Sequence, residues 1–96
     1  MAIIRTTRFT AEPADAEQVL ARRAALIAAL RAATPGLTEA RLTRIDERTW
    51  VDMWRWDSLA DLEAATALAP SLPETKAAFE VAKDPSAEQG ELVDER

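Results

Sequence analysis

The alternation of apolar and polar residues predicts three strands in the first part of the chain. Residues 2–9 (AIIRTTRF) are rich in β-branched and aromatic side chains, which favour a strand. Residues 37–45 (LTEARLTRI) and 48–56 (RTWVDMWRW) follow a similar pattern and are separated only by residues 46 and 47. A short polar connection between two strand patterns indicates an antiparallel hairpin.

A helical repeat occupies the segment between the first two strands. Pro13 and Asp15 mark its start, and the Thr-Pro-Gly sequence at residues 34–36 ends it after Ala33. The larger apolar residues of this segment fit one stripe of a helix: Val19, Leu20, Leu26, Ile27 and Leu30. The sequence therefore predicts one long helix with an apolar face.

Two more helices are predicted after the hairpin, each from a capping pattern. Ser58 precedes Asp61 by three positions, as in a capping box, and Pro70 ends the helix that they begin. Ser71 and Glu74 repeat that spacing, which predicts that a third helix starts at Ser71.

The chain closes with a predicted turn at residues 83–86 (KDPS) and a weak strand pattern at residues 87–93 (AEQGELV). Because the composition shows no break, we expect residues 1–96 to form one domain of order β-α-β-β-α-(α)-β. This order is the ferredoxin-like split βαβ, an α+β fold with helices on one face of a four-stranded antiparallel sheet. A second copy of the chain is the simplest cover for the other face, which predicts a homodimer.

All three tryptophans lie in the third predicted strand. Side chains alternate along a strand, so four residues share one face: Trp50, Asp52, Trp54 and Trp56. The indoles form the larger apolar surface, and this face should therefore meet the helices. The residues between them would face the partner subunit: Val51, Met53 and Arg55.

Asp52 places a carboxylate among these indoles, and an unpaired carboxylate is costly to bury. Arg23 lies near the centre of the apolar stripe of the first helix, so we expect it to approach Asp52. This makes Arg23 and Asp52 candidate catalytic residues. The candidate substrate-binding residues are Trp50, Trp54 and Trp56.

Simpler interpretations of the same residues stay open. Alternating tryptophans near a helix more often form core than a reactive pocket. Asp52 could reach water at a strand edge, and Arg23 could extend its charged head to solvent. An ion pair between them could also be purely structural.

Composition excludes several kinds of chemistry. The net charge of −5, without a basic stripe, argues against a nucleic-acid partner. The chain has no membrane-spanning apolar run and no signal-peptide pattern, so we expect a cytoplasmic protein that does not bind membranes. It has no histidine, cysteine, tyrosine or asparagine, which removes the imidazole base, the catalytic triad and the usual zinc ligands. The C-terminal acidic residues also lack the spacing of ligands for a hard cation, so we expect no metal. We expect no cofactor either.

Residues 50–65 (WVDMWRWDSLADLEAA) resemble the strand–helix junction of the antibiotic biosynthesis monooxygenase (ABM) family, in the dimeric α/β-barrel superfamily. In that family a strand ends in a tryptophan and an amphipathic helix led by an acid and a serine follows. Trp56, Asp57 and Ser58 take those places. The TPGL segment at residues 34–37 is similar to the family's entry into its second strand, and the element order matches over about residues 2–93.

The resemblance implies a homodimer whose two sheets form a barrel, with a pocket between helices and sheet in each subunit. Some members oxidise aromatic polyketides with molecular oxygen and without metal or flavin, because the substrate supplies its own carbanion. In such a pocket Trp54 and Trp56 would stack on the ring, and Arg23 would stabilise an enolate or phenolate.

The chain departs from the family in three places. The polyketide-oxidising members use an asparagine and a tyrosine that are absent here, and alanines around Ala64 and Ala65 stand where many members carry a histidine. Haem-degrading relatives need an axial histidine, so that branch is excluded. The leading hypothesis is a cofactor-independent monooxygenase of a small aromatic or polyketide-like metabolite. The alternatives are a non-catalytic small-molecule-binding or accessory homodimer and a purely structural dimerisation module.

Overall fold

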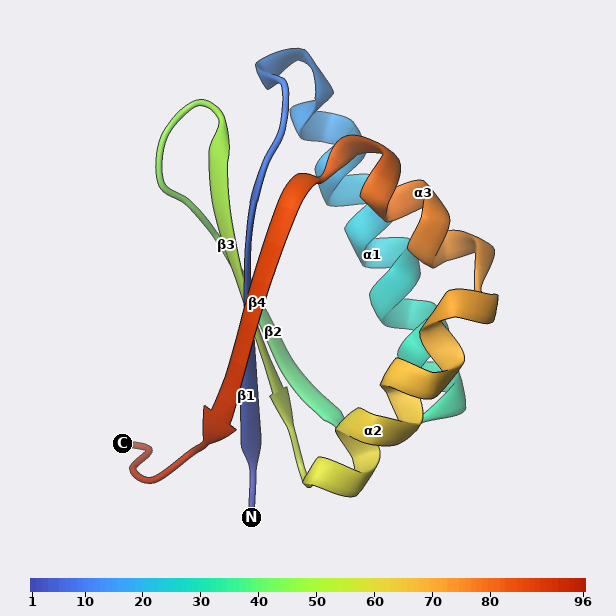
Figure 1. The fold of residues 1–96 in the computed structure, drawn as a ribbon, viewed down its shortest axis with the longest axis vertical. Helices are drawn as coiled ribbons and strands as arrows, with labels where there is room; N and C mark the ends of the chain where they lie inside the picture. Colours follow the sequence, from blue (N-terminus) through green and yellow to red (C-terminus); the bar gives the residue numbers. More distant parts are fainter.

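The computed structural model describes residues 1–96, in which all helices cover one face of a four-stranded sheet (Figure 1). The strands are β1 (Ile3–Thr10), β2 (Leu37–Arg44), β3 (Thr49–Trp56) and β4 (Lys83–Glu91). The helices are α1 (Ala16–Ala33), α2 (Leu59–Leu68) and α3 (Pro73–Val81), with the 3-10 turns η1 (Pro13–Asp15) and η2 (Ala69–Ser71). Neighbouring strands are antiparallel, in the order β2-β3-β1-β4. The predicted ferredoxin-like α+β fold is confirmed.

The alternation along β3 divides its residues as predicted. Trp50, Asp52 and Trp56 are buried, with Trp56 only 1% exposed, and they lie on the face covered by the helices. Their neighbours Val51 and Met53 lie on the uncovered face of the sheet, where both are partly exposed. The period-two pattern therefore identified the inner face of this strand.

The buried apolar residues form two clusters. The larger cluster brings α1, α2 and the sheet together around Trp56: Ile3, Leu26, Ile27, Leu30, Leu37, Trp56, Leu62 and Ala65. The smaller cluster surrounds Phe9 and Trp50, whose rings are nearly parallel with centroids 6.3 Å apart. None of the helices combines the length and apolar character that crossing a bilayer requires.

The apolar stripe of α1 is narrower than predicted. Val19, Leu26, Ile27 and Leu30 are buried, but Leu20 is 52% exposed. One residue step turns a helix by about 100°, and this step carries Leu20 from the position of Val19 to the flank of the helix. The inclusion of Leu20 in the stripe was therefore wrong.

The start of α2 follows the capping pattern, except that the Asp61 carboxylate bonds to the Ser58 side chain and not to the Ser58 backbone N–H. The Ser58 hydroxyl oxygen accepts a hydrogen bond from the backbone N–H of Asp61 at 3.1 Å. The Asp61 carboxylate accepts a bond in return, but from the Ser58 hydroxyl at 2.9 Å. Gly36 lies against this cap, because a Cβ atom on Gly36 would come within 2.6 Å of Asp61 Cβ. The residue before β2, Gly36, thus lies so close to Asp61 in the first turn of α2 that a side chain at position 36 would not fit.

The predicted cap at Ser71 is wrong. Ser71 belongs to η2, and its hydroxyl donates to the Leu68 carbonyl at 2.7 Å, which ties it to the preceding helix. The N-cap residue of α3 is Leu72, followed by Pro73 in the first turn. Proline suits this position because its missing N–H would have no partner in the helix.

The predicted turn at residues 83–86 is also wrong, because these residues begin β4. The segment forms a bulge at the edge of the sheet. The register with β1 shifts between Arg8 and Thr10, and Asp84 in the shifted segment has a φ of 49°. Pro85 follows at an edge strand, where the absent N–H is tolerated. Pairing with β1 therefore overrides the local preference for a turn.

Candidate functional site

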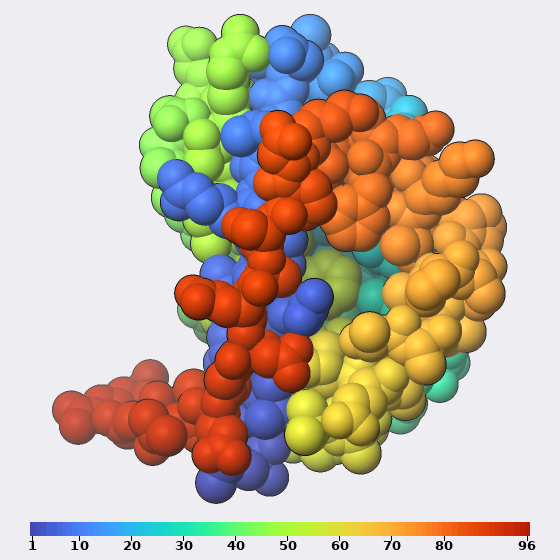
Figure 2. Space-filling view, viewed as in Figure 1, coloured from blue at the N-terminus to red at the C-terminus, as the bar shows by residue number.

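A cavity of about 750 Å³ lies between the sheet and the helices. Its size falls within the usual range of small-molecule sites. Apolar residues make up 13 of the 21 that line it, and they come from all three helices and from every strand except β2. Figure 2 shows the hollow between β4 and the segment of α2 and α3. The fold therefore forms a largely apolar, partly open cavity between the sheet and the helices.

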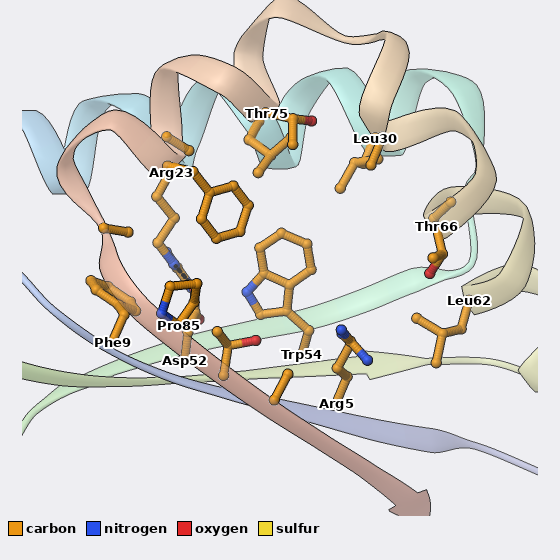
Figure 3. Close-up of a pocket in the computed structure, with 18 of the residues that line it drawn as sticks. Arg5, Phe9, Arg23, Leu30, Asp52, Trp54, Leu62, Thr66, Thr75 and Pro85 are labelled. Atoms are coloured by element: carbon orange, nitrogen blue, oxygen red, sulfur yellow. Dashed lines mark hydrogen bonds and ion pairs between the residues drawn. The ribbon is translucent and has the colours of Figure 1, made fainter.

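Arg23 and Asp52 form a bidentate ion pair in the wall of this cavity (Figure 3). Arg23 Nε donates to Asp52 Oδ2 at 2.9 Å, and Nη2 donates to Oδ1 at 3.0 Å. The exposed fractions of the two side chains are 19% and 9%. The predicted approach of these residues is confirmed, and Asp52 does not reach water at a strand edge, because β3 lies inside the sheet and Asp52 is buried. A guanidinium carries five N–H groups, and this pair uses two of those of Arg23.

The structure places two of the three tryptophans at the cavity. Trp54 and Trp56 line it, with ring centroids 6.4 Å apart and planes inclined by 46°. Trp50 is not among the lining residues. It packs on Phe9, and the Arg44 guanidinium lies 4.7 Å from its ring centroid. Trp50 shares the face of Trp54 but serves the smaller core cluster.

Several buried polar atoms of the lining have no hydrogen-bond partner in the protein. They are Nε1 of Trp54, Nε1 of Trp56 and Oγ1 of Thr75. A buried donor without a partner loses free energy. The wall of the cavity thus contains a few polar groups that the protein itself does not pair.

The sequence analysis missed the part of the site that comes from β1. Arg5, Thr7 and Phe9 all line the cavity. The alternation used for β3 would have found them, because these residues share the face of Ile3, which pairs with Trp56. The contributions of β4 had no comparable signal, since Pro85 and Ala87 lie in or beside the segment expected to be a turn.

The groups with shifted pKa values lie outside the cavity. Hydrogen bonds from the backbone of Arg48 and from Thr49 lower the pKa of Asp46 in the β2–β3 connection. A hydrogen bond to Glu12 raises the pKa of Arg48. No three acidic side chains are grouped so that they could hold a metal ion.

The structure defines a ferredoxin-like α+β protein with a largely apolar cavity between sheet and helices. The chain belongs to the antibiotic biosynthesis monooxygenase family, whose model matches residues 2–84. A comparison with curated proteins gave no match.

Three solved structures show the same fold. SnoaB, a cofactor-independent oxygenase from Streptomyces nogalater, has 23% identity and a TM-score of 0.75, covering 98% of this chain and 95% of SnoaB. Rv0793 from Mycobacterium tuberculosis has 19% identity and a TM-score of 0.71, covering 99% and 98%. A dimeric ferredoxin-like protein from an uncultured marine organism has 14% identity and a TM-score of 0.73, covering 99% and 90%. At these identities the likeness concerns the fold alone.

Proposed function

We propose that the protein is a cofactor-independent monooxygenase that acts on a small aromatic or polyketide-like molecule, as a cytoplasmic homodimer. One observation carries the proposal: a largely apolar cavity of about 750 Å³ has a buried Arg23–Asp52 ion pair in its wall. Family membership and the oxygenase function of the similarly folded SnoaB support the same class of reaction.

The proposed reaction converts an activated methylene group of the substrate, flanked by aromatic rings or a carbonyl, into a ketone. The methylene loses a proton to water or hydroxide, and the carbanion is delocalised as an enolate or phenolate. Molecular oxygen adds to this carbon and a proton is taken up, which gives a hydroperoxide. Loss of water then leaves the ketone. The carbon is oxidised by four electrons and molecular oxygen is reduced by four, so no other reductant is needed.

Each proposed residue has a distinct role. The free N–H groups of Arg23 stabilise the enolate oxygen, while Asp52 positions the guanidinium through both hydrogen bonds. Trp54 and Trp56 provide the aromatic walls. Trp50 acts only indirectly, by supporting β3 through its stacking on Phe9. A bound ring would displace most of the water from the apolar cavity, which strengthens the interaction between the cation and the developing anion.

Anthrone, whose methylene is oxidised to anthraquinone, tests the proposal. We expect saturable anthraquinone formation that requires oxygen and exceeds the spontaneous oxidation measured without protein. Arg23→Met should lower the rate by about 100-fold, the effect of removing an oxyanion donor. Lys76→Gln, which removes a positive charge on the exposed side of α3, serves as the matched control. A protein-containing rate equal to the spontaneous rate would reject the proposal for this substrate class.

A second function, binding without catalysis, is favoured by one specific observation. Asp52 is the only carboxylate that lines the cavity, and both of its oxygens accept from Arg23. The cavity therefore holds no free side-chain base. Saturable quenching of tryptophan fluorescence without an oxygen-dependent product would establish the binding function. The absence of both responses would favour a structural module.

The homodimer would form through the sheet face opposite the helices. Figure 1 shows that none of the helices lies on this face. It carries Ile4, Val51 and Met53, which are all partly exposed in the single chain. The dimeric state of the similarly folded marine protein supports a homodimer, without indicating which face forms it.

A further inference from the structure

Three charged side chains line the cavity, and only one of them lacks a countercharge. Arg23 and Asp52 neutralise each other in the bidentate pair. Arg5 also lines the cavity, and none of the seven ion pairs of the structure includes it. The cavity therefore carries one uncompensated positive charge, in a chain whose net charge is −5.

The position of Arg5 follows from the register of the sheet. On β1 it lies opposite Trp54 of β3 on one side and Gln89 of β4 on the other. Its Nη1 donates to Gln89 Oε1 at 2.9 Å. This bond orients the guanidinium with a neutral partner, so the positive charge remains available.

Figure 3 shows the Arg5 guanidinium beside the Trp54 indole and turned from the sheet into the cavity, toward Leu62. The Arg5 cation and the aromatic surface of Trp54 therefore lie together in the wall of the cavity.

We propose that Arg5 is an anion-binding residue, and that the natural ligand is an aromatic molecule with a carboxylate or an ionised phenol. Its anionic oxygen binds the Arg5 guanidinium while its ring packs beside Trp54. A guanidinium has the planar donor pair that a carboxylate accepts in a bidentate manner. This substrate class rests on the proposed function, since it assumes that the same cavity receives the ligand.

The charge also determines which ligands are rejected. A neutral aromatic molecule that displaced water from Arg5 would give the guanidinium no anionic partner in exchange. Hydrogen bonds to a charged group contribute more than neutral ones, and the difference corresponds to about tenfold or more in affinity. Arg5 is therefore a specificity-determining residue that separates acids from their neutral analogues.

The test compares 2-naphthoate with 2-naphthamide, which has the same ring and no charge, by isothermal titration calorimetry without a turnover step. We expect the wild-type protein to bind the acid at least about tenfold more tightly than the amide. Arg5→Gln should abolish this preference by weakening the acid alone. Lys76→Gln removes the same charge outside the cavity and should keep the preference, which excludes a general effect of net charge.

Two further arms complete the experiment. 4-Nitrophenol, titrated below and above its own ionisation near neutral pH, distinguishes a phenolate from a carboxylate ligand. Arg5→Lys keeps the charge but loses the planar donor pair, so it should retain only part of the preference, and it provides a second variant if Arg5→Gln does not fold.

The outcomes separate this proposal from the oxygenase proposal. The anion site is overturned if the wild-type protein prefers neither 2-naphthoate over 2-naphthamide nor ionised over neutral 4-nitrophenol. It is also overturned if Arg5→Gln leaves the affinity for the preferred anion unchanged. A preference for the acid that depends on Arg5, without oxygen-dependent turnover of any tested substrate, supports the anion site and rejects the oxygenase.

Discussion

Arg23 of α1 and Asp52 of β3 are joined by two hydrogen bonds of 2.9 and 3.0 Å, the one direct charged link between a helix and the central strands. Because both side chains are largely buried, removal of either partner leaves the other charge poorly compensated. Arg23→Met and Asp52→Leu should each reduce the free energy of unfolding by about 3 kcal/mol. Urea denaturation measures this loss.

The double variant distinguishes a buried pair from two independent contributions. Arg23→Met combined with Asp52→Leu removes both charges and supplies apolar volume, so its loss of stability should be smaller than either single loss. Arg41→Met, which breaks an exposed pair with Glu39, should change stability by less than about 1 kcal/mol. A double variant as unstable as the sum of the singles would contradict this account.

The two glycines provide a matched test of close packing. Gly36→Ala should reduce the free energy of unfolding by about 1–3 kcal/mol, because its Cβ would press against the rigid Cβ of Asp61. A Cβ atom on Gly90 would have no neighbouring atom within 4 Å, so Gly90→Ala should leave stability nearly unchanged. Equal thermal shifts for both variants would show that the β2–α2 approach is looser than the structure indicates.

Two serines separate a helix cap from a turn hydroxyl. Ser58→Ala removes the acceptor for the Asp61 N–H and should lower stability by about 1 kcal/mol. Ser71→Ala removes only an exposed bond to the Leu68 carbonyl and should have a smaller effect. The ratio of the two losses, measured by chemical denaturation, tests the reassignment of the α3 start to Leu72. A larger loss for Ser71→Ala would favour the capping role that the sequence predicted.

Asp46 contributes a pH-dependent part of the stability. Its pKa is lowered in the folded protein by hydrogen bonds from the backbone of Arg48 and from Thr49, so folding favours the carboxylate. This contribution is present above the unfolded pKa of 3.8 and disappears as the pH falls through the lower folded value. Asp46→Asn should therefore show a shallower loss of stability below about pH 4 than the wild type, in thermal melts across that range.

The uncovered sheet face provides a test of assembly. Met53 lies on this face beside Val51, and a charge there would be buried in the proposed dimer. Met53→Glu should shift the wild-type dimer to a monomer in light scattering. Thr66→Glu, on the helix side of the molecule, should leave the dimer intact. A wild-type monomer at micromolar concentration would contradict the proposed dimer.

The periodicity of the sequence predicted the face to which each side chain points, but not how far the cavity extends along the strand. A period of two places Asp52 and Trp54 on the inner face, and the helical repeat places Arg23 toward them, so the ion pair could be predicted. The same face holds Trp50, but a cavity ends at some point along a strand, and periodicity carries no information on that point. Here the ring of Phe9 fills the space beside Trp50.

The errors in the second half of the chain have a related cause. Asp84 and Pro85 have the composition of a turn, and Ser71 has that of a cap, when each is considered with its sequence neighbours alone. Pairing with β1, which is distant in the sequence, places Asp84 and Pro85 in an edge-strand bulge. Ser71 lies in the 3-10 turn before Leu72 and is therefore not the N-cap residue of α3. Long-range contacts thus overruled local preferences where the local signals were short.

The strand β4 has a consequence for ligand exchange. All nine of its residues are exposed, its only neighbour in the sheet is β1, and a bulge interrupts that pairing near Pro85. Its amides should therefore exchange hydrogen for deuterium faster than those of β3, which is paired on both sides. Since Pro85 and Ala87 also form part of the cavity wall, transient separation of this edge from β1 would widen the cavity without unfolding the rest of the domain.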